Sequence, residues 1–166
     1  MPSTALPPAL GDSLPRLPDR SAVCVVGLGA TGVAASNLLA RAGYRVRAID
    51  GREGPRPDAL DPRVVVDRPS HDPKDAAAVV LSPGVNPEWP EHRDRPWMQA
   101  LLADRDAGRR LVLSEVELGA ASFAGAMLTV GGTDGKSTTA AMAHHLLSTL
   151  GIDAALGGNS WRPLSE

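Results

Sequence analysis

Short apolar runs alternate with Ala- and Leu-rich segments along most of the chain. Short runs rich in valine, isoleucine and leucine predict buried strands, and apolar side chains at helical spacing predict helices. The strands are expected at 21–26, 44–49, 63–66, 76–81, 111–113 and 126–130, and the longer helices at 31–42, 97–107 and 137–150. We also expect Ser114 to cap a short acidic helix that starts at Glu115. Strands that alternate with helices are typical of an α/β fold, in which helices cover both faces of a parallel sheet.

The same pattern divides the chain into three parts. Residues 1–20 are rich in proline and polar side chains and have no periodicity, so we expect a flexible leader. Residues 21–120 contain a full set of alternating strands and helices, which predicts one Rossmann-like unit. Residues 126–166 begin a second unit with a strand and a helix.

A glycine loop follows the first expected strand. Gly27-Leu28-Gly29-Ala30-Thr31-Gly32 fits the pattern G-x-G-x-x-G between a strand and a helix. The first glycine permits a tight turn, the second allows a phosphate to approach the backbone, and the third allows close packing of the helix on the strand. Asp50 ends the next strand, where dinucleotide enzymes place an acid on a ribose hydroxyl. This loop predicts a nucleotide-like ligand. Taken alone it favours an NAD(P)-dependent oxidoreductase, and glycines with a purely structural role are the alternative.

A second glycine loop, Gly132-Thr133-Asp134-Gly135-Lys136-Ser137-Thr138, lies between the strand and the helix expected in the second unit. This is the arrangement of a phosphate-binding loop. Its backbone amides would surround phosphate oxygens, Lys136 would neutralise their charge, and the Ser137 hydroxyl would bind Mg²⁺. The general pattern has a glycine where Val130 stands, so the match departs at one position. A chance Gly-Lys-Ser triplet at a strand–helix boundary is the alternative.

Composition narrows the class of protein. Hydrophobic residues make up 43% of the 166 residues and aromatic residues 3%, so the core must consist of Ala, Val, Leu and Ile. The net charge is -2 and lysine and arginine form no long run, so we expect no nucleic-acid partner. The single cysteine, Cys24, lies in an apolar run and is expected to be a buried thiol. With neither a signal-peptide pattern nor an apolar stretch of about 20 residues, we expect a cytoplasmic protein without a membrane span.

The two loops, in this order, resemble the Mur ligases. Gly132 to Ser137 match the family's phosphate-binding loop, G-T-x-G-K-[ST]. The branch of the family that adds D-glutamate also carries a dinucleotide-like glycine loop in its first domain. Five segments of this chain resemble segments of that branch, in the same order: Gly29-Ala30-Thr31-Gly32, Asp50-Gly51-Arg52, Leu81-Ser82-Pro83-Gly84-Val85, Ser114-Glu115-Val116-Glu117-Leu118, and Gly157-Gly158-Asn159 with Pro163-Leu164. The resemblance covers about residues 21 to 166.

The resemblance implies two binding sites. The first domain would bind a UDP-linked substrate, and residues 126–166 would be the start of a truncated ATP-binding central domain of the P-loop class. Residues implied at the UDP site are Gly27, Gly29, Ala30, Thr31, Gly32, Asp50, Gly51, Arg52, Ser82, Pro83, Gly84 and Asn159. Residues implied at the ATP site are Gly132, Thr133, Asp134, Gly135, Lys136, Ser137 and Thr138, with Lys136 and Ser137 catalytic and Ser137 on Mg²⁺. Asp134 replaces the asparagine usual in the family, which should weaken ATP binding.

The resemblance also implies a reaction. ATP would phosphorylate the carboxylate of UDP-N-acetylmuramoyl-L-alanine, and the amine of D-glutamate would attack the acyl phosphate in peptidoglycan precursor synthesis. Family members are longer and carry a complete ATPase domain and a third domain. We therefore expect this chain to be the N-terminal portion of such a ligase, a monomer that binds the UDP substrate without turnover. A non-catalytic UDP-sugar-binding module is the alternative.

Overall fold

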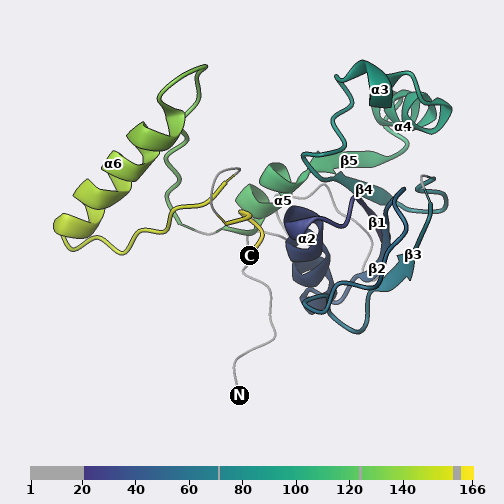
Figure 1. The fold of residues 1–166 in the computed structure, drawn as a ribbon, viewed down its shortest axis with the longest axis horizontal. Coiled ribbons are helices and arrows are strands. Elements are labelled where there is room, and N and C mark those ends of the chain that lie inside the picture. Colours follow the sequence, from purple (N-terminus) through teal and green to yellow (C-terminus); the bar gives the residue numbers. More distant parts are fainter. Residues whose placement is uncertain (1–20, 71, 124, 159–161) are drawn as a thin grey trace.

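The computed structural model describes residues 21–70, 72–123, 125–158 and 162–166. It contains one sheet of five parallel strands, in the order β3-β2-β1-β4-β5 (Figure 1). The strands are β1 (Ala22–Val26), β2 (Arg45–Ile49), β3 (Val65–Asp67), β4 (Ala78–Leu81) and β5 (Leu111–Ser114). This order, with β1 at the centre, is that of a Rossmann-like sheet, so the predicted α/β class is confirmed.

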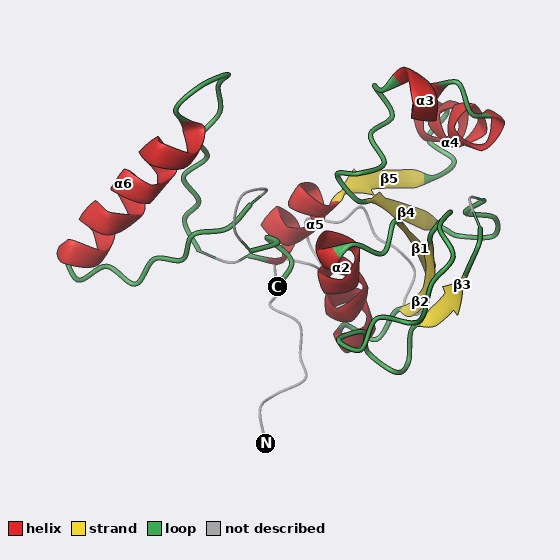
Figure 2. Ribbon diagram, in the orientation of Figure 1, coloured by secondary structure: helices red, strands yellow, loops and turns green. Residues whose placement is uncertain are grey.

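Helices cover the sheet on both faces (Figure 2). Helices α2 (Ala30–Arg41) and α5 (Glu115–Ser122) lie on one face, and α4 (Pro96–Asp106) lies on the other. Because successive side chains of a strand point to opposite faces, neighbouring residues of β1 and β4 belong to different hydrophobic clusters. The cluster beneath α2 and α5 includes Val23, Val25, Ala48, Val80 and Leu118, and the cluster beneath α4 includes Cys24, Val26, Ile49, Val79 and Met98. Burial on both faces explains why the central strands are continuous apolar runs.

The predicted elements of the first unit are present with small shifts of their ends. Ser114 caps α5 as expected, in a capping box where Ser114 and Glu117 exchange hydrogen bonds. The short helix α3 (Pro90–Arg93) was not predicted, because one turn is too short to show a helical period.

The second unit is only partly as predicted. Its helix, α6 (Lys136–Thr149), is present, and Gly151 follows it with a φ of 75°. The strand expected at 126–130 is wrong, since the structure has no strand there. A strand forms only when its backbone is hydrogen-bonded to a neighbouring strand. The sheet ends at β5, and residues 126–130 are not paired with it. Helix α6 lies well apart from the sheet (Figure 1), and none of its residues is buried.

Cys24 lies in the middle of β1, fully buried beneath α4. Burial raises the pKa of its thiol to about 12, so the group stays protonated at neutral pH. The interpretation of Cys24 as a buried thiol is confirmed. Within the described residues, no helix combines the length and the apolar character needed to cross a membrane.

Candidate functional site

Three loops meet at one edge of the sheet, where parallel strands β1, β2 and β4 end. Gly27 N–H donates to the Ile49 carbonyl at 2.8 Å, and Ser82 N–H donates to the Val26 carbonyl at 3.0 Å. The loops after β1, β2 and β4 are therefore held side by side. Strand β1 pairs with β2 on one side and β4 on the other, so the chain changes direction across the sheet here. In open α/β sheets, ligands bind outside the carboxyl ends of the strands at this kind of switch point.

Two glycines of the first loop are required by contacts inside the protein. Gly27 has a φ of +95°, and a Cβ there would lie 2.1 Å from the Ser82 hydroxyl oxygen. At Gly32, which is in the first turn of α2, a Cβ would lie 1.8 Å from the Gly27 carbonyl oxygen. These two glycines allow the helix, the turn and the loop after β4 to pack against one another.

Gly29 has a different environment. It precedes α2 with a φ of -74°, is exposed, and a Cβ there would meet nothing within 4 Å. No side chain caps this end of the helix. The first N–H groups of a helix lack partners within the helix, and the helix dipole makes this end attractive to anions. The amino end of α2 thus faces solvent beside Gly29, and its geometry fits a phosphate group.

Asp50, directly after β2, is 5% exposed and binds the protein with both oxygens. Its Oδ2 accepts the Leu28 N–H at 2.8 Å, and its Oδ1 accepts the Arg52 backbone N–H at 2.9 Å and Nε at 3.0 Å. The hydrogen bonds from the Arg52 side chain, assisted by the Leu28 amide, hold the pKa of Asp50 well below its usual range despite its burial. Asp50 therefore anchors the glycine loop and Arg52 in place. Its contact with a ligand stays a prediction.

Two arginines surround this carboxylate. The Arg52 side chain is 77% exposed, whereas that of Arg68 is 13% exposed, with its Nη2 3.8 Å from Asp50 Oδ2. Arg68 also donates from Nη1 to the Pro55 carbonyl at 2.9 Å. Two guanidinium groups beside one carboxylate leave a net positive charge, which suits a phosphorylated ligand. No pattern in the sequence indicates Arg68, because this residue follows β3 outside any motif.

The loop after β4 completes this edge. Ser82 is buried beside Gly27, while Pro83 and Gly84 are exposed, and Val85 N–H donates to the Ser82 carbonyl at 2.8 Å. The predicted residues of the UDP site that lie in the loops after β1, β2 and β4 are thus brought together. The remaining one, Asn159, lies outside the described residues.

The second glycine loop precedes α6. Gly132 and Gly135 have positive φ values of 141° and 74°, and Lys136 is the first residue of the helix. The Lys136 Nζ donates to the Thr133 carbonyl at 2.6 Å, which folds the lysine over the loop. Residues 131–139 are exposed. A glycine-rich turn at a helix amino end with a lysine fits a phosphate group.

The two predicted sites are not brought together, because α6 lies apart from the sheet (Figure 1). In the part of the chain that the structure describes, no three His, Cys, Asp or Glu side chains gather in a way that could hold a metal ion. The role of Ser137 in binding Mg²⁺ therefore stays a prediction.

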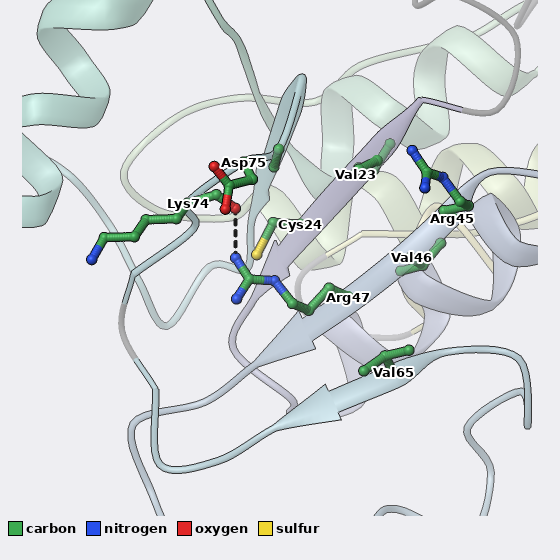
Figure 3. Close-up of a pocket in the computed structure, with 10 residues that line it drawn as sticks. Val23, Cys24, Arg45, Val46, Arg47, Val65, Lys74 and Asp75 are labelled. Carbon is green, nitrogen blue, oxygen red and sulfur yellow. Dashed lines mark hydrogen bonds between the residues drawn. The ribbon is translucent and has the colours of Figure 1, made fainter.

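A cavity of about 430 Å³ lies at the opposite edge of the sheet, where β1, β2 and β3 begin (Figure 3). Arg47 extends over it, and its guanidinium donates to the Asp67 carboxylate at 3.3 Å and to the Asp72 and Lys74 carbonyls at 3.2 and 2.7 Å. The guanidinium thus serves the protein's own structure. This cavity contains none of the predicted site residues. Ligands of open α/β sheets bind at the carboxyl ends of the strands, so the other edge is the better candidate.

Known proteins are similar to this chain in sequence. A family profile described as "Mur ligase MurD-like, N-terminal domain" matches residues 21–95. A UDP-N-acetylmuramoylalanine--D-glutamate ligase of Geobacter metallireducens is 40% identical over 154 residues, covering 87% of this chain and 31% of the relative. Proteins of the same name from Paramagnetospirillum magneticum and Nitratidesulfovibrio vulgaris are each 36% identical, over 140 and 151 residues. These alignments cover 82% and 86% of this chain and 29% and 33% of the relatives.

The chain therefore spans about a third of the length of the curated relatives it matches, and the match includes both glycine loops within one continuous stretch of similarity. The Rossmann-like sheet, the order of the loops at its carboxyl edge and the profile match at residues 21–95 lead to one conclusion. The chain belongs to the Mur ligase family, and its first unit is a MurD-like N-terminal domain.

Proposed function

We propose that this chain is the N-terminal portion of an ATP-dependent UDP-N-acetylmuramoyl-L-alanine:D-glutamate ligase. In this proposal the UDP end of the muramoyl substrate binds at the carboxyl edge of the sheet, over the first glycine loop. The observation that carries it is the contrast within that loop. Protein atoms occupy the space where a Cβ of Gly27 or Gly32 would lie, whereas Gly29 faces open space at the amino end of α2. Arg52 and Arg68 add positive charge beside it.

The first loop would act by binding and orientation. The amides at the start of α2 would receive the diphosphate, and Asp50 would keep the loop and Arg52 in the conformation that receives it. Because both Asp50 oxygens already accept hydrogen bonds from the protein, this site needs little rearrangement to bind an anion.

The second loop would bind the triphosphate of ATP. The positive φ values of Gly132 and Gly135 and the place of Lys136 at the start of α6 support this role. Lys136 would leave the Thr133 carbonyl and neutralise the charge of the transferred phosphoryl group. Mg²⁺, held by Ser137 and phosphate oxygens, would supply further charge neutralisation. Transfer of the γ-phosphoryl group from ATP to the substrate carboxylate would give an acyl phosphate and release ADP. The amine of D-glutamate would then attack the acyl carbon, and inorganic phosphate would leave as the amide forms.

We propose that the chain binds the UDP substrate but does not complete the reaction by itself. Each residue from 131 to 139, in the loop that would hold ATP and the start of α6, is exposed, and α6 has no buried residue. Transfer of a phosphoryl group needs a site that excludes water and fixes both reactants. A cytoplasmic location fits this proposal, since the free thiol of Cys24 suits a reducing compartment.

Isothermal titration calorimetry of the full chain tests the proposal. UDP-N-acetylmuramoyl-L-alanine should bind saturably, UDP should compete with it, and NADH should give no saturable heat.

Arg52→Gln should raise the dissociation constant of UDP-N-acetylmuramoyl-L-alanine about fivefold, because a charge-assisted hydrogen bond to phosphate is lost. Arg109→Gln is the matched control, since Arg109 is another exposed arginine paired with an aspartate, away from this edge. Saturable NADH binding that UDP does not displace would instead support an oxidoreductase. A third outcome is that the chain binds the UDP substrate but a full-length ligase that contains this chain forms no amide. That outcome would support a non-catalytic module.

A further inference from the structure

A buried carboxylate joins the first unit to the end of the chain. Glu115, the first residue of α5, is 2% exposed, and Ser165 is 3% exposed. The Glu115 Oε1 accepts hydrogen bonds from both the backbone N–H and the hydroxyl of Ser165, each at 2.7 Å. A buried carboxylate is stable only when it is hydrogen-bonded, and bonds to a charged acceptor are among the strong ones. This pair is therefore a firm contact between residues far apart in the sequence.

Leu164 strengthens the contact. A Cβ at Gly119, one turn into α5, would lie 2.7 Å from the Leu164 carbonyl carbon, so only a glycine lets Leu164 approach the helix this closely. A Cβ at Gly157 would lie 3.2 Å from Leu164 Cδ1, and Gly158 N–H donates to the Arg162 carbonyl at 2.8 Å. We call Glu115, Gly119, Leu164 and Ser165 the clasp. Through it, the Gly157-Gly158 turn is fastened to the Rossmann-like unit.

The clasp lies at the edge of the sheet that carries the candidate site. Helix α5 begins directly after β5, and the last residue of β5, Ser114, is paired with Leu81 at the end of β4. Leu81 precedes Ser82, which contacts Gly27 of the first loop. Figure 1 shows the C-terminal end of the chain returning to lie beside α5, as the hydrogen bonds of Ser165 to Glu115 require. By contrast, residues 126–130 at the start of the second unit have no regular structure, so this segment cannot fix where the second unit lies.

We propose that Glu115 is a positioning residue. Through Ser165 it holds the Gly157-Gly158 turn of the second unit at the carboxyl edge, so that the part of the substrate beyond the UDP meets a fixed surface. This inference rests on the proposed function. It predicts that the clasp matters for the muramoyl substrate, which extends past the first loop, and does not matter for UDP, which ends there.

The test uses the full chain as wild type, three variants of the clasp (Glu115→Ala, Glu115→Gln and Ser165→Ala) and one control. Glu117→Gln is the matched control, because Glu117 lies on the same helix but its side chain is used in the exposed capping box. Hydrogen exchange at the amides of residues 164–166 reports on the clasp without any ligand. Calorimetry with UDP and with UDP-N-acetylmuramoyl-L-alanine reports on binding.

Glu115→Ala should accelerate exchange at residues 164–166 about tenfold or more, since two hydrogen bonds to a charged acceptor are removed. It should weaken binding of the muramoyl substrate about fivefold and leave UDP binding unchanged. Glu115→Gln retains an acceptor oxygen and should restore most of the affinity, and Glu117→Gln should match the wild type. Ser165→Ala removes one donor and should show a smaller effect in the same direction, which keeps the test decisive if Glu115→Ala fails to fold.

Three results would overturn the inference. Unchanged exchange at residues 164–166 would mean that no clasp forms in solution. Unchanged binding of the muramoyl substrate, or an equal loss for both ligands, would mean that the contact serves stability alone. A wild-type chain that binds neither ligand would refute the proposed function, and the inference would fall with it.

Discussion

Gly32 and Gly29 belong to the same loop motif, but alanine substitution should lower stability at Gly32 and weaken ligand binding at Gly29. At Gly32 the new Cβ would lie 1.8 Å from the Gly27 carbonyl oxygen, about 1.6 Å short of the 3.4 Å at which ordinary contact begins. The obstacle is backbone, so no side-chain rotation relieves it. Either α2 moves away from the end of β1, or the turn at Gly27 changes shape and the Gly27–Ile49 hydrogen bond is strained.

The expected cost of Gly32→Ala follows from two opposing effects. Inserting a methyl group into a packed backbone contact costs about 3 kcal/mol, the upper part of the usual range for overpacking. Alanine in a helix gains about 1 kcal/mol over glycine, which offsets part of this cost. The net loss in the free energy of unfolding is about 2 kcal/mol, and for a unit of about 100 residues it lowers Tm by about 8 to 16 °C.

Gly29→Ala is the matched variant. A Cβ at Gly29 meets nothing within 4 Å and its φ of -74° suits any residue, so stability should change by about 0.5 kcal/mol or less. The methyl group would occupy the space in front of the helix amino end, where a phosphate is expected to approach. Binding of the UDP substrate should therefore weaken about tenfold.

Thermal unfolding followed by circular dichroism, with calorimetry of the UDP substrate on the same samples, separates the two effects. Gly32→Ala should show a stability defect, and Gly29→Ala should show a binding defect with near-normal stability. A Gly32→Ala chain as stable as the wild type would show that the close approach of α2 to Gly27 is not present in solution. Unimpaired UDP-substrate binding by Gly29→Ala would refute the assigned place of the phosphate.

Three further predictions concern charge and capping. Asp50→Asn should lower the free energy of unfolding by about 2 kcal/mol at pH 7, because Arg52 loses a charged acceptor. The folded-state pKa of Asp50 lies below the unfolded value, so this contribution is complete above about pH 4 and is lost as the pH falls toward the folded pKa. Urea titrations of wild type and Asp50→Asn should therefore show a smaller difference in the free energy of unfolding at pH 3 than at pH 7. An equal difference at both pH values would contradict the ion-pair origin. Ser114→Ala should cost about 1 kcal/mol by removing the capping box, measured by urea unfolding, with no loss expected for Ser114→Thr, which retains the hydroxyl. Asp134→Asn should tighten ATP binding about threefold at low salt, since a unit charge about 7 Å from a phosphate in water contributes on the order of 0.6 kcal/mol. Equal ATP affinities of wild type and Asp134→Asn in calorimetry would show that this side chain does not face the nucleotide.

Local patterns predicted most of the first unit. The apolar runs of β1 and β4 are buried on both faces, which makes them easy to identify as central strands, and the glycines after β1 predicted the turn that the structure contains. Ser114 predicted the start of α5, because capping depends on residues three apart. These features are determined by neighbours in the sequence, so the sequence shows them directly.

The features that the sequence did not show depend on distant residues. The sequence pattern did not show that the Leu28 amide and Arg52 would bind both oxygens of Asp50, and the contact of Asp50 with a ligand stays a prediction. Arg68 approaches Asp50 only because β3 pairs with β2. The strand expected at 126–130 has an apolar sequence but no neighbouring strand, and apolar character alone does not make a strand.

The protonated thiol of Cys24 makes this chain convenient for spectroscopy. It is the single cysteine in the sequence, and it lies fully buried with a pKa raised to about 12. Because thiolates are the species that react with maleimides and oxidants, Cys24 should resist labelling while the protein is folded. A cysteine introduced at exposed Met142 on α6 would then be the one reactive thiol of the native chain. A fluorophore there would report directly on how α6 moves when a nucleotide is added.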